Sequence, residues 1–379
     1  MWNFNKKKFG GINYNGFIRS YDESKKKYVV QYKNRNDTEE LSHNEVTKII
    51  NTDPTRRRRR DRIRNRTNLD QQDLHGETLA AKDSDVFGNN YPEIPNNNST
   101  IITFQNIGQQ PQSKYDYKSI ATSKSFRASH ANIALYAEIS LNEKKIKVGE
   151  KFNDRMKHFN PKSFSLVSSN RHCGPDASWN VVGGTAITID EGFVSHRVQQ
   201  GMGKDNKGLG RWVYSRFRGA ANQHFRCISA YRPCKNTGPN STWSQQLTYF
   251  RENGEECTDP RDNFDADFIS EIEEWIETGD AMIIGIDMNA DVRTSKLARK
   301  LKELGLRELI LTTHSNASPP ATFIRNTNRT PIDGLWGTET VEVFRAGYTS
   351  FDYISPAAPS DGHRLLWAEV YNQSILGKK

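Results

Sequence analysis

A block of arginines divides the chain into two parts that cannot share one fold. Residues 56–66 place eight arginines in eleven positions, and polar, asparagine-rich sequence continues to residue 99. Like charges at this density repel one another, and a segment with so few apolar residues buries too little surface to fold. We therefore predict a disordered linker over residues 53–99. Folded parts at residues 1–52 and 100–373 would flank it, with a short tail at 374–379.

The charge of the chain favours a polyanionic partner. Lys and Arg number 54 against 45 Asp and Glu, a net charge of +9, and 19 of these basic residues lie in the first 99 positions. We expect the block to contact nucleic acid, DNA above all, or to direct nuclear import. A solvated spacer is the alternative. The arginines assigned to this contact are Arg56, Arg57, Arg58, Arg59 and Arg60.

Several protein classes are disfavoured by the sequence. The four cysteines are too few for a disulfide scaffold and none are spaced as CxxC, so we expect reduced thiols and no zinc ribbon. The first residues contain no apolar run typical of a signal sequence, and no stretch approaches the roughly 18 apolar residues of a membrane span. We expect a soluble nuclear or cytoplasmic protein that is neither secreted nor bound to a membrane.

The first fifty residues alternate between short apolar runs and turn-like segments. Tyr28–Tyr32 is the clearest run, and NYNG, DESKKK and KNRND separate the runs. This region resembles a Tudor or chromo-type barrel through Gly16-Phe17-Ile18, Tyr21-Asp22, Tyr28–Tyr32 and Glu39-Glu40-Leu41. The resemblance implies a small all-β barrel that binds a chromatin or other protein tail through an aromatic cage. Alternatively, the tyrosines form core contacts and cross-strand pairs.

From residue 101 the pattern changes to strands interspersed with helices. Apolar residues three and four apart predict helices over Asp267–Thr278 and Thr294–Leu304, with Thr294 as the N-cap and Gly279 and Gly305 as stops. The pattern favours a layered α/β domain. The predicted strands are Ile101–Phe104, Ile133–Tyr136, Ala186–Ile189, Arg226–Tyr231, Met282–Ile286, Val341–Val343 and Leu365–Val370.

Polar side chains recur where these predicted strands end. In IIGIDMNADVR, Asp287 and Asn289 are two residues apart and would leave a strand on the same face, offering a base or metal ligand beside an orienting amide. An ordinary turn after a strand is the alternative. A histidine near an acid is suited to proton transfer near neutral pH. The other polar residues at strand ends are Asn106, Glu138, Tyr231, Arg232, Asp333, Asp361 and His363.

In this order the motifs resemble the endonuclease/exonuclease/phosphatase superfamily. Its Asn, Glu, Y-x-P, G-D-x-N, I-D and S-D-H motifs correspond to Asn106, Glu138, Tyr231-Arg232-Pro233, Gly285–Asn289, Ile332-Asp333 and Ser360–His363. Retroelement-type members are the most similar. The resemblance implies a four-layered α/β sandwich (α+β), in which two mixed sheets pack face to face beneath outer helices.

The resemblance also implies a role for each residue. Glu138 would coordinate Mg²⁺, with Mn²⁺ as a substitute, supported by Asn106 and with Asp361 nearby. Asp287 would activate water while Asn289 and Tyr231 hold the phosphate. His363 would stabilise charge on the phosphorane, aligned by Asp333.

One departure from the family pattern bears on activity. Gly362 interrupts the usual contiguous Ser-Asp-His, and an extra residue turns the following side chain to the other face unless a bulge absorbs it. Glycine is the residue that permits such a bulge. Either His363 reaches the site, or the site is damaged.

These observations predict a Mg²⁺-dependent hydrolase that cleaves phosphodiester bonds in nucleic acid. A phosphoinositide or other phosphomonoester phosphatase is one alternative, and a non-catalytic DNA or chromatin-binding module is another. Basic residues near aromatic ones are expected to line a phosphate-backbone groove, with an ordinary basic strand as the alternative. They are Arg211, Arg216, Arg218 and Arg232.

Overall fold

The chain forms two compact units, Met1–Asp73 and Leu74–Lys379. The computed structural model describes the following residues: 3–9, 12–22, 25, 27–32, 38–42, 86–92, 96–172, 180–314, 320–325, 328–350 and 362–378. The predicted arginine arm, Arg56–Arg60, lies outside the described residues, as does the predicted metal ligand Asp361.

The first unit contains one antiparallel four-stranded sheet. Its strands pair in chain order, as expected for short strands joined by tight turns. The Nζ atom of Lys25 lies 2.9 Å from a carboxylate oxygen of Glu40 on the last strand. The strands are β1 (Asn3–Phe9), β2 (Ile12–Asp22), β3 (Lys27–Tyr32) and β4 (Thr38–Ser42).

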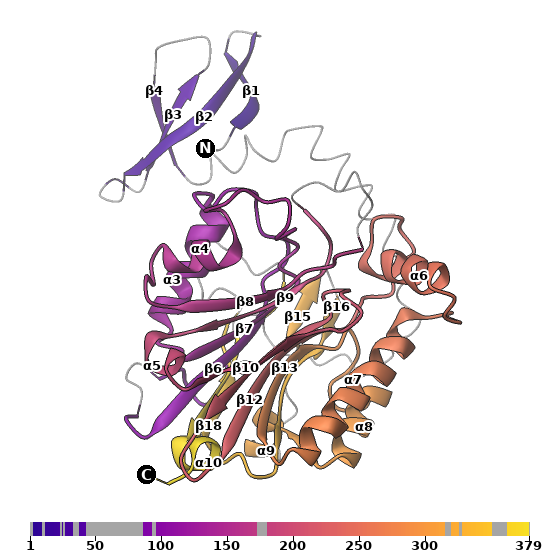
Figure 1. Cartoon of the computed structure of the whole chain (residues 1–379). Coiled ribbons are helices and arrows are strands. Elements are labelled where there is room, and N and C mark those ends of the chain that lie inside the picture. Colours follow the sequence, from indigo (N-terminus) through magenta and orange to yellow (C-terminus); the bar gives the residue numbers. More distant parts are fainter. Residues whose placement is uncertain are drawn as a thin grey trace. The chain divides into compact units, whose positions relative to one another are not determined.

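The second unit is built on two large mixed sheets, which Figure 1 shows packed together with helices on the outside. The seven-stranded sheet has the order β5 (Phe87–Gly88), β18 (Val343–Tyr348), β19 (Leu366–Tyr371), β6 (Ser99–Asn106), β7 (Ile133–Ala137), β9 (Thr185–Ile189) and β8 (Phe164–Ser168). The six-stranded sheet has the order β10 (Arg197–Lys204), β11 (Trp212–Arg218), β12 (His224–Tyr231), β13 (Ala281–Asp287), β17 (Asp333–Thr338) and β14 (Leu306–Glu308). A separate hairpin pairs β15 (Phe323–Arg325) with β16 (Asn328–Thr330).

Eight helices are described in this unit. They are α3 (Tyr117–Ala128), α4 (Phe152–Lys157), α5 (Glu191–Val194), α6 (Thr242–Glu252), α7 (Pro260–Glu277), α8 (Lys296–Glu303), α9 (Leu309–Thr313) and α10 (Asn372–Leu376). Among the described residues, no helix is both long and apolar enough to cross a bilayer.

Three apolar clusters separate four layers. Alternate side chains of β13 show the arrangement: Ile283 packs between the two sheets, whereas Met282 and Ile284 pack outward against α7 and α8. On the other sheet, Leu135 faces the inner cluster and Tyr136 packs outward with side chains of α3 and α4. The predicted four-layered sandwich is therefore confirmed.

The two sheets approach closely at Gly285. A Cβ atom there would lie 2.5 Å from the ring of Phe104 and 2.8 Å from Leu135, both on the opposing sheet. The glycine thus leaves room for large side chains beneath the end of β13.

Element boundaries differ from the prediction where local signals mislead. Helix α7 begins at Pro260, capped by Asp259, because proline suits a first helical position. Ser295, rather than Thr294, caps α8 by accepting a hydrogen bond from the Ala298 amide. Gly279 and Gly305 do follow helices, with φ of 73° and 81°.

The predicted domain limits also need correction at both ends. Part of the predicted linker is ordered, because β5 pairs with β18 and Phe87 is 9% exposed in the inner core. The predicted tail contributes to α10, where Ile375 is fully buried.

Candidate active site

The candidate site lies where strand ends from both sheets meet. Tyr231, Asp287 and Asp333 are register partners across β12, β13 and β17. On the other sheet, Asn106 ends β6 beside Ala137, and Glu138 follows directly. Parallel pairing of β6 with β7 and of β12 with β13 brings these ends to one edge.

Asn106 links the acids of the two sheets. Its Nδ2 donates to an oxygen of Glu138 at 3.0 Å and to an oxygen of Asp287 at 2.8 Å. Its Oδ1 accepts from the Gly108 amide at 2.9 Å, which fixes the orientation of the carboxamide. Glu138 stands at a φ of 58°, a conformation uncommon for a residue with a side chain. Asn106 therefore holds two like charges in one place.

Asp333 and His363 form a buried pair that also crosses from sheet to sheet. His363 Nδ1 lies 3.1 and 2.9 Å from the two oxygens of Asp333, and these side chains are 7% and 0% exposed. Burial alone would lower the pKa of His363, but the charge and hydrogen bond of Asp333 outweigh it and raise the pKa to about 9. His363 is thus held as a cation near neutral pH.

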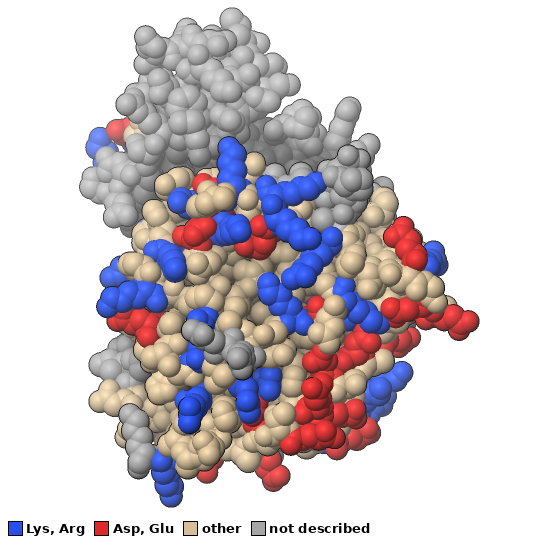
Figure 2. All heavy atoms as spheres, in the orientation of Figure 1, with Lys and Arg blue, Asp and Glu red and all other residues tan. Residues whose placement is uncertain are grey.

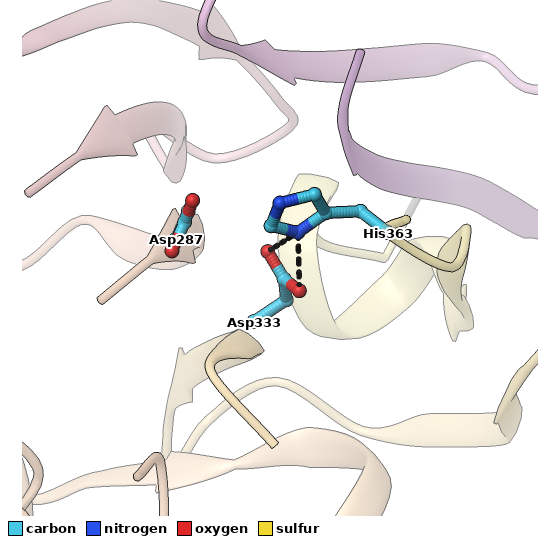
Figure 3. A group of neighbouring side chains, drawn as sticks. All are labelled: Asp287, Asp333 and His363. Carbon is cyan, nitrogen blue, oxygen red and sulfur yellow. Dashed lines mark hydrogen bonds and ion pairs between the residues drawn. The ribbon is translucent and has the colours of Figure 1, made fainter. Parts of the chain in front are cut away.

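Asp287 lies opposite this pair. The ligand atoms of Asp287, Asp333 and His363 all lie within 4.8 Å of one another, and Figure 3 shows Asp287 apart from the hydrogen-bonded pair. Burial, followed by the charge of Asp333, raises the pKa of Asp287 to about 7, against the opposing effects of His363 and Asn106. A carboxylate in this environment can accept a proton near neutral pH.

The inserted Gly362 does not remove His363 from the site. Gly362 has a φ of 100°, and its carbonyl accepts a hydrogen bond from the Ile324 amide at 2.8 Å. His363 then pairs with Phe323 in an isolated antiparallel bridge, and the two rings are 4.4 Å apart. The extra residue is absorbed by a backbone conformation that glycine favours.

Tyr231 lies in the same cluster with its side chain buried. Burial, and then the charges of Glu138 and Asp287, raise the pKa of its hydroxyl well above the ordinary range. The hydroxyl therefore stays protonated and can serve as a hydrogen-bond donor.

Asn289 is near Asp287, but not for the reason predicted. Strand β13 ends at Asp287, and Asn289 has a φ of 47°, so strand alternation does not extend to it. Its backbone amide donates to Asp287 Oδ1 at 2.9 Å, while its side chain donates to the Arg232 carbonyl at 2.7 Å. The turn orients Asp287 through the backbone.

The structure pairs three of the four arginines of the predicted groove with internal acids. Arg211 is 1% exposed and donates to both Asp205 and Asp267. The guanidinium of Arg216 donates twice to Asp280, at 2.8 and 2.7 Å, and that of Arg232 donates twice to Asp265, at 2.7 and 3.0 Å. Arg218 is exposed, and it lies opposite His224 in the register of β11 and β12, at the far end of these strands from Tyr231. The guanidinium groups of Arg211, Arg216 and Arg232 balance internal acids because buried charges need partners.

Sequence reasoning missed Thr322, which joins the strands that carry Asp333 and His363. The Thr322 hydroxyl accepts from the amides of Ile332 and Asp333, both at 2.9 Å. Its carbonyl accepts from the Arg364 amide at 2.8 Å. No local pattern marks it, because a threonine among short polar segments has no periodicity.

The comparisons with known proteins agree with this architecture. The family model of the PTM/DIR17-like Tudor domain matches residues 5–50. No curated protein matches the sequence. The catalytic domain of APE2 from Xenopus laevis is similar in structure, with 13% identity, a TM-score of 0.50, and coverage of 72% of this chain and 92% of that domain.

The described residues of the second unit share the fold of the APE2 catalytic domain, a sandwich of two mixed sheets. Two further solved structures are similar at lower TM-scores. The human Nocturnin catalytic domain has 14% identity and a TM-score of 0.48, covering 73% of this chain and 96% of that one. An AP endonuclease from Archaeoglobus fulgidus has 12% identity and a TM-score of 0.48, covering 71% and 98%. At 13% identity, the likeness to the APE2 domain establishes the fold alone.

Proposed function

We propose that the second unit is a divalent-metal-dependent phosphodiesterase that cleaves nucleic acid, with DNA as the preferred substrate. The observation that carries this proposal is the meeting of Glu138, Asp287 and the Asp333–His363 pair at one edge of the sandwich. His363 is the cation that the described residues place against these carboxylates. Three acids beside one cation favour a bound metal ion.

The residues fit an oxygen-preferring cation at Glu138. Asn106 contacts one carboxylate oxygen of Glu138, and the other oxygen has no hydrogen bond within the described part of the chain. The Asp287, Asp333 and His363 group suits Mg²⁺ less well, because Nδ1 of His363 is already bound to Asp333 and Mg²⁺ prefers oxygen ligands. The metal would offset the negative charge of the phosphate.

Three side chains of the protein have separate roles in the proposed reaction. Asp287, with its pKa raised to about 7, accepts a proton from the attacking water. His363, held as a cation by Asp333, stabilises the charge that develops on the phosphate oxygens. The protonated hydroxyl of Tyr231 donates to the phosphate.

The test measures the activity of the full chain on different substrates and with different metal ions. Supercoiled plasmid, an abasic-site duplex and soluble inositol phosphates are each incubated with Mg²⁺, Mn²⁺ or EDTA. We expect metal-dependent nicking that falls by at least about 100-fold in Asp287→Asn and Asp333→Asn. Hydrolysis of inositol phosphates without nicking would favour the phosphatase. DNA binding without turnover of any substrate would favour a non-catalytic module.

For the first unit we propose binding of a modified protein tail, and for the whole chain a nuclear location. The match to a Tudor domain supports the first proposal, and the arginine block of residues 56–66 is the basis of the second. Binding of methylated lysine and arginine peptides is measured for the full chain and for Tyr21→Ala, Tyr28→Ala and Tyr32→Ala, with Tyr117→Ala in the second unit as the control. Peptide binding that survives all three first-unit substitutions would refute the aromatic cage.

A further inference from the structure

Two loops that begin at the candidate site carry a group of exposed lysines. One loop follows Asn106 and leads into α3, and the other follows Glu138 and leads into α4. Lys144, Lys147 and Lys151 are exposed and Lys114 is half-buried. We call these four residues the lysine rim.

A buried arginine fixes the two loops to each other. Arg155 of α4 is 2% exposed, and its guanidinium donates to the carbonyls of Glu150, Pro111 and Gln112 at 2.7, 2.6 and 2.7 Å. The Lys114 amide donates to the Glu150 carboxylate. The lysine rim is therefore part of a defined surface.

The rim lysines have acidic neighbours, such as Glu143 near Lys151, but these acids are bound elsewhere. Within the described residues, none of the four rim lysines forms an ion pair. Two acids in the same loop accept hydrogen bonds from the backbone, Glu143 from the Phe152 amide and Glu150 from the Lys114 amide. Positive charge therefore remains available to a ligand.

On the opposite side of the site, basic side chains are paired with acids. Around α7, basic side chains are paired: Lys207 with Glu255 at 2.6 Å, Arg261 with Asp259 at 2.7 Å, and Arg293 with Asp291 at 2.7 Å. Figure 2 shows Asp and Glu gathered along α7, whereas Lys and Arg are spread over the left and centre of the same face with a few acids among them. The acidic surface along α7 repels a polyanion, and the more basic remainder of this face attracts it.

We infer that the lysine rim binds the phosphate backbone of a nucleic-acid strand whose scissile phosphate lies at the Glu138–Asp287 site. This inference rests on the proposed function and adds the path of the strand. Lys144 follows Glu138 by six residues, so their Cα atoms are at most about 21 Å apart. That upper limit equals about six phosphates of a duplex strand, so a strand that lies in the site can also reach the rim. Four lysines spread over two loops suit the repeated phosphates of a polymer.

Two exposed side chains beside the rim suit the same ligand. Tyr115 is 64% exposed, with Lys114 Nζ 5.3 Å from its ring centre, and Val148 is 95% exposed between the lysines. An aromatic ring can stack on a base or sugar, and an apolar side chain can enter a groove.

The experiment measures binding separately from cleavage. The full chain carrying Asp287→Asn is titrated with a 20-base-pair DNA duplex between 50 and 200 mM NaCl. A triple variant, Lys144→Ala with Lys147→Ala and Lys151→Ala, is compared with a control that also removes three charges, Lys296→Ala with Arg299→Ala and Lys300→Ala on α8. Thermal unfolding of both variants verifies that they fold.

We expect the rim variant to lower the slope of log K against log salt by about 2.7, at 0.9 for each phosphate contact. Over this fourfold salt range, its affinity would fall about 40-fold less than that of the parent. Equal slopes in the rim and control variants would overturn the inference, even if the active chain cuts DNA. If only the rim variant has a lower salt slope, but the chain cleaves no substrate, the result would support strand binding by the lysine rim and refute the proposed cleavage.

Discussion

Replacing Gly362 by alanine tests whether the inserted glycine delivers His363 to the site. A left-handed backbone costs about 1–2 kcal/mol for a residue with a Cβ atom, and Gly362 has a φ of 100°. The new Cβ would also lie 2.3 Å from the Ile324 carbonyl oxygen, a backbone atom that cannot rotate away. Relieving that contact sacrifices the hydrogen bond between the Ile324 amide and the Gly362 carbonyl, at about 0.5–1.5 kcal/mol. We expect a total destabilisation of about 1.5–3.5 kcal/mol.

Gly279→Ala is the matched control for this substitution. Gly279 has a φ of 73°, and nothing lies within 4 Å of its added Cβ atom, so it reports the backbone cost alone. Urea unfolding compares the stability of the two variants. Plasmid nicking compares their rates, and a shift of His363 by about 1 Å would lower the rate by about 100-fold. The control should retain the full rate.

Two outcomes would refute the role of Gly362 in positioning His363. If both variants lose the same free energy and keep the same nicking rate, the close approach of Gly362 to Ile324 does not position His363. If only stability falls, the backbone at Gly362 supports the fold without setting the geometry of the site.

Three further substitutions test other parts of the structure. Thr322→Val leaves the Ile332 and Asp333 amides without an acceptor, so we expect a lower nicking rate at unchanged KM and a loss of about 1–3 kcal/mol of stability. Thr322→Ser keeps the hydroxyl and should restore the rate and the stability. A normal nicking rate in the valine variant would exclude a positioning role for Thr322. Burial raises the pKa of Glu308 from 4.5 to about 7. Between these pH values the folded state binds more protons than the unfolded state, so stability falls by about 3 kcal/mol as pH rises. Urea unfolding at pH 5 and 8 should show this decrease in the parent but not in Glu308→Gln, and an identical pH dependence in both chains would contradict the raised pKa of Glu308. Arg211→Ala should destabilise the folded chain by about 3–5 kcal/mol because Asp205 is left buried and unpaired. Its DNA affinity in a filter-binding assay should be unchanged. Weaker DNA binding by the folded variant would indicate that Arg211 does contact nucleic acid.

Much of the fold was predictable because periodicity is a local property. The apolar run Met282–Ile286 and the helical spacing within α7 are each evident from a few neighbouring residues, and the structure has both elements. Boundaries were less predictable. Helix α7 starts at Pro260, before its apolar repeat is clear, and β5 is a two-residue strand whose pairing partner is more than 250 residues away.

The sequence by itself determined which polar residues end strands, because chain order and strand periodicity are written locally. It did not determine which of them touch. Asn106 reaches Asp287, and His363 reaches Asp333, only because two sheets pack face to face and bring their strand ends to one edge. The arginines show the converse. Arg211 and Arg232 follow a pattern typical of nucleic-acid contact, but the tertiary structure buries them, and burial obliges each charge to pair with an internal acid.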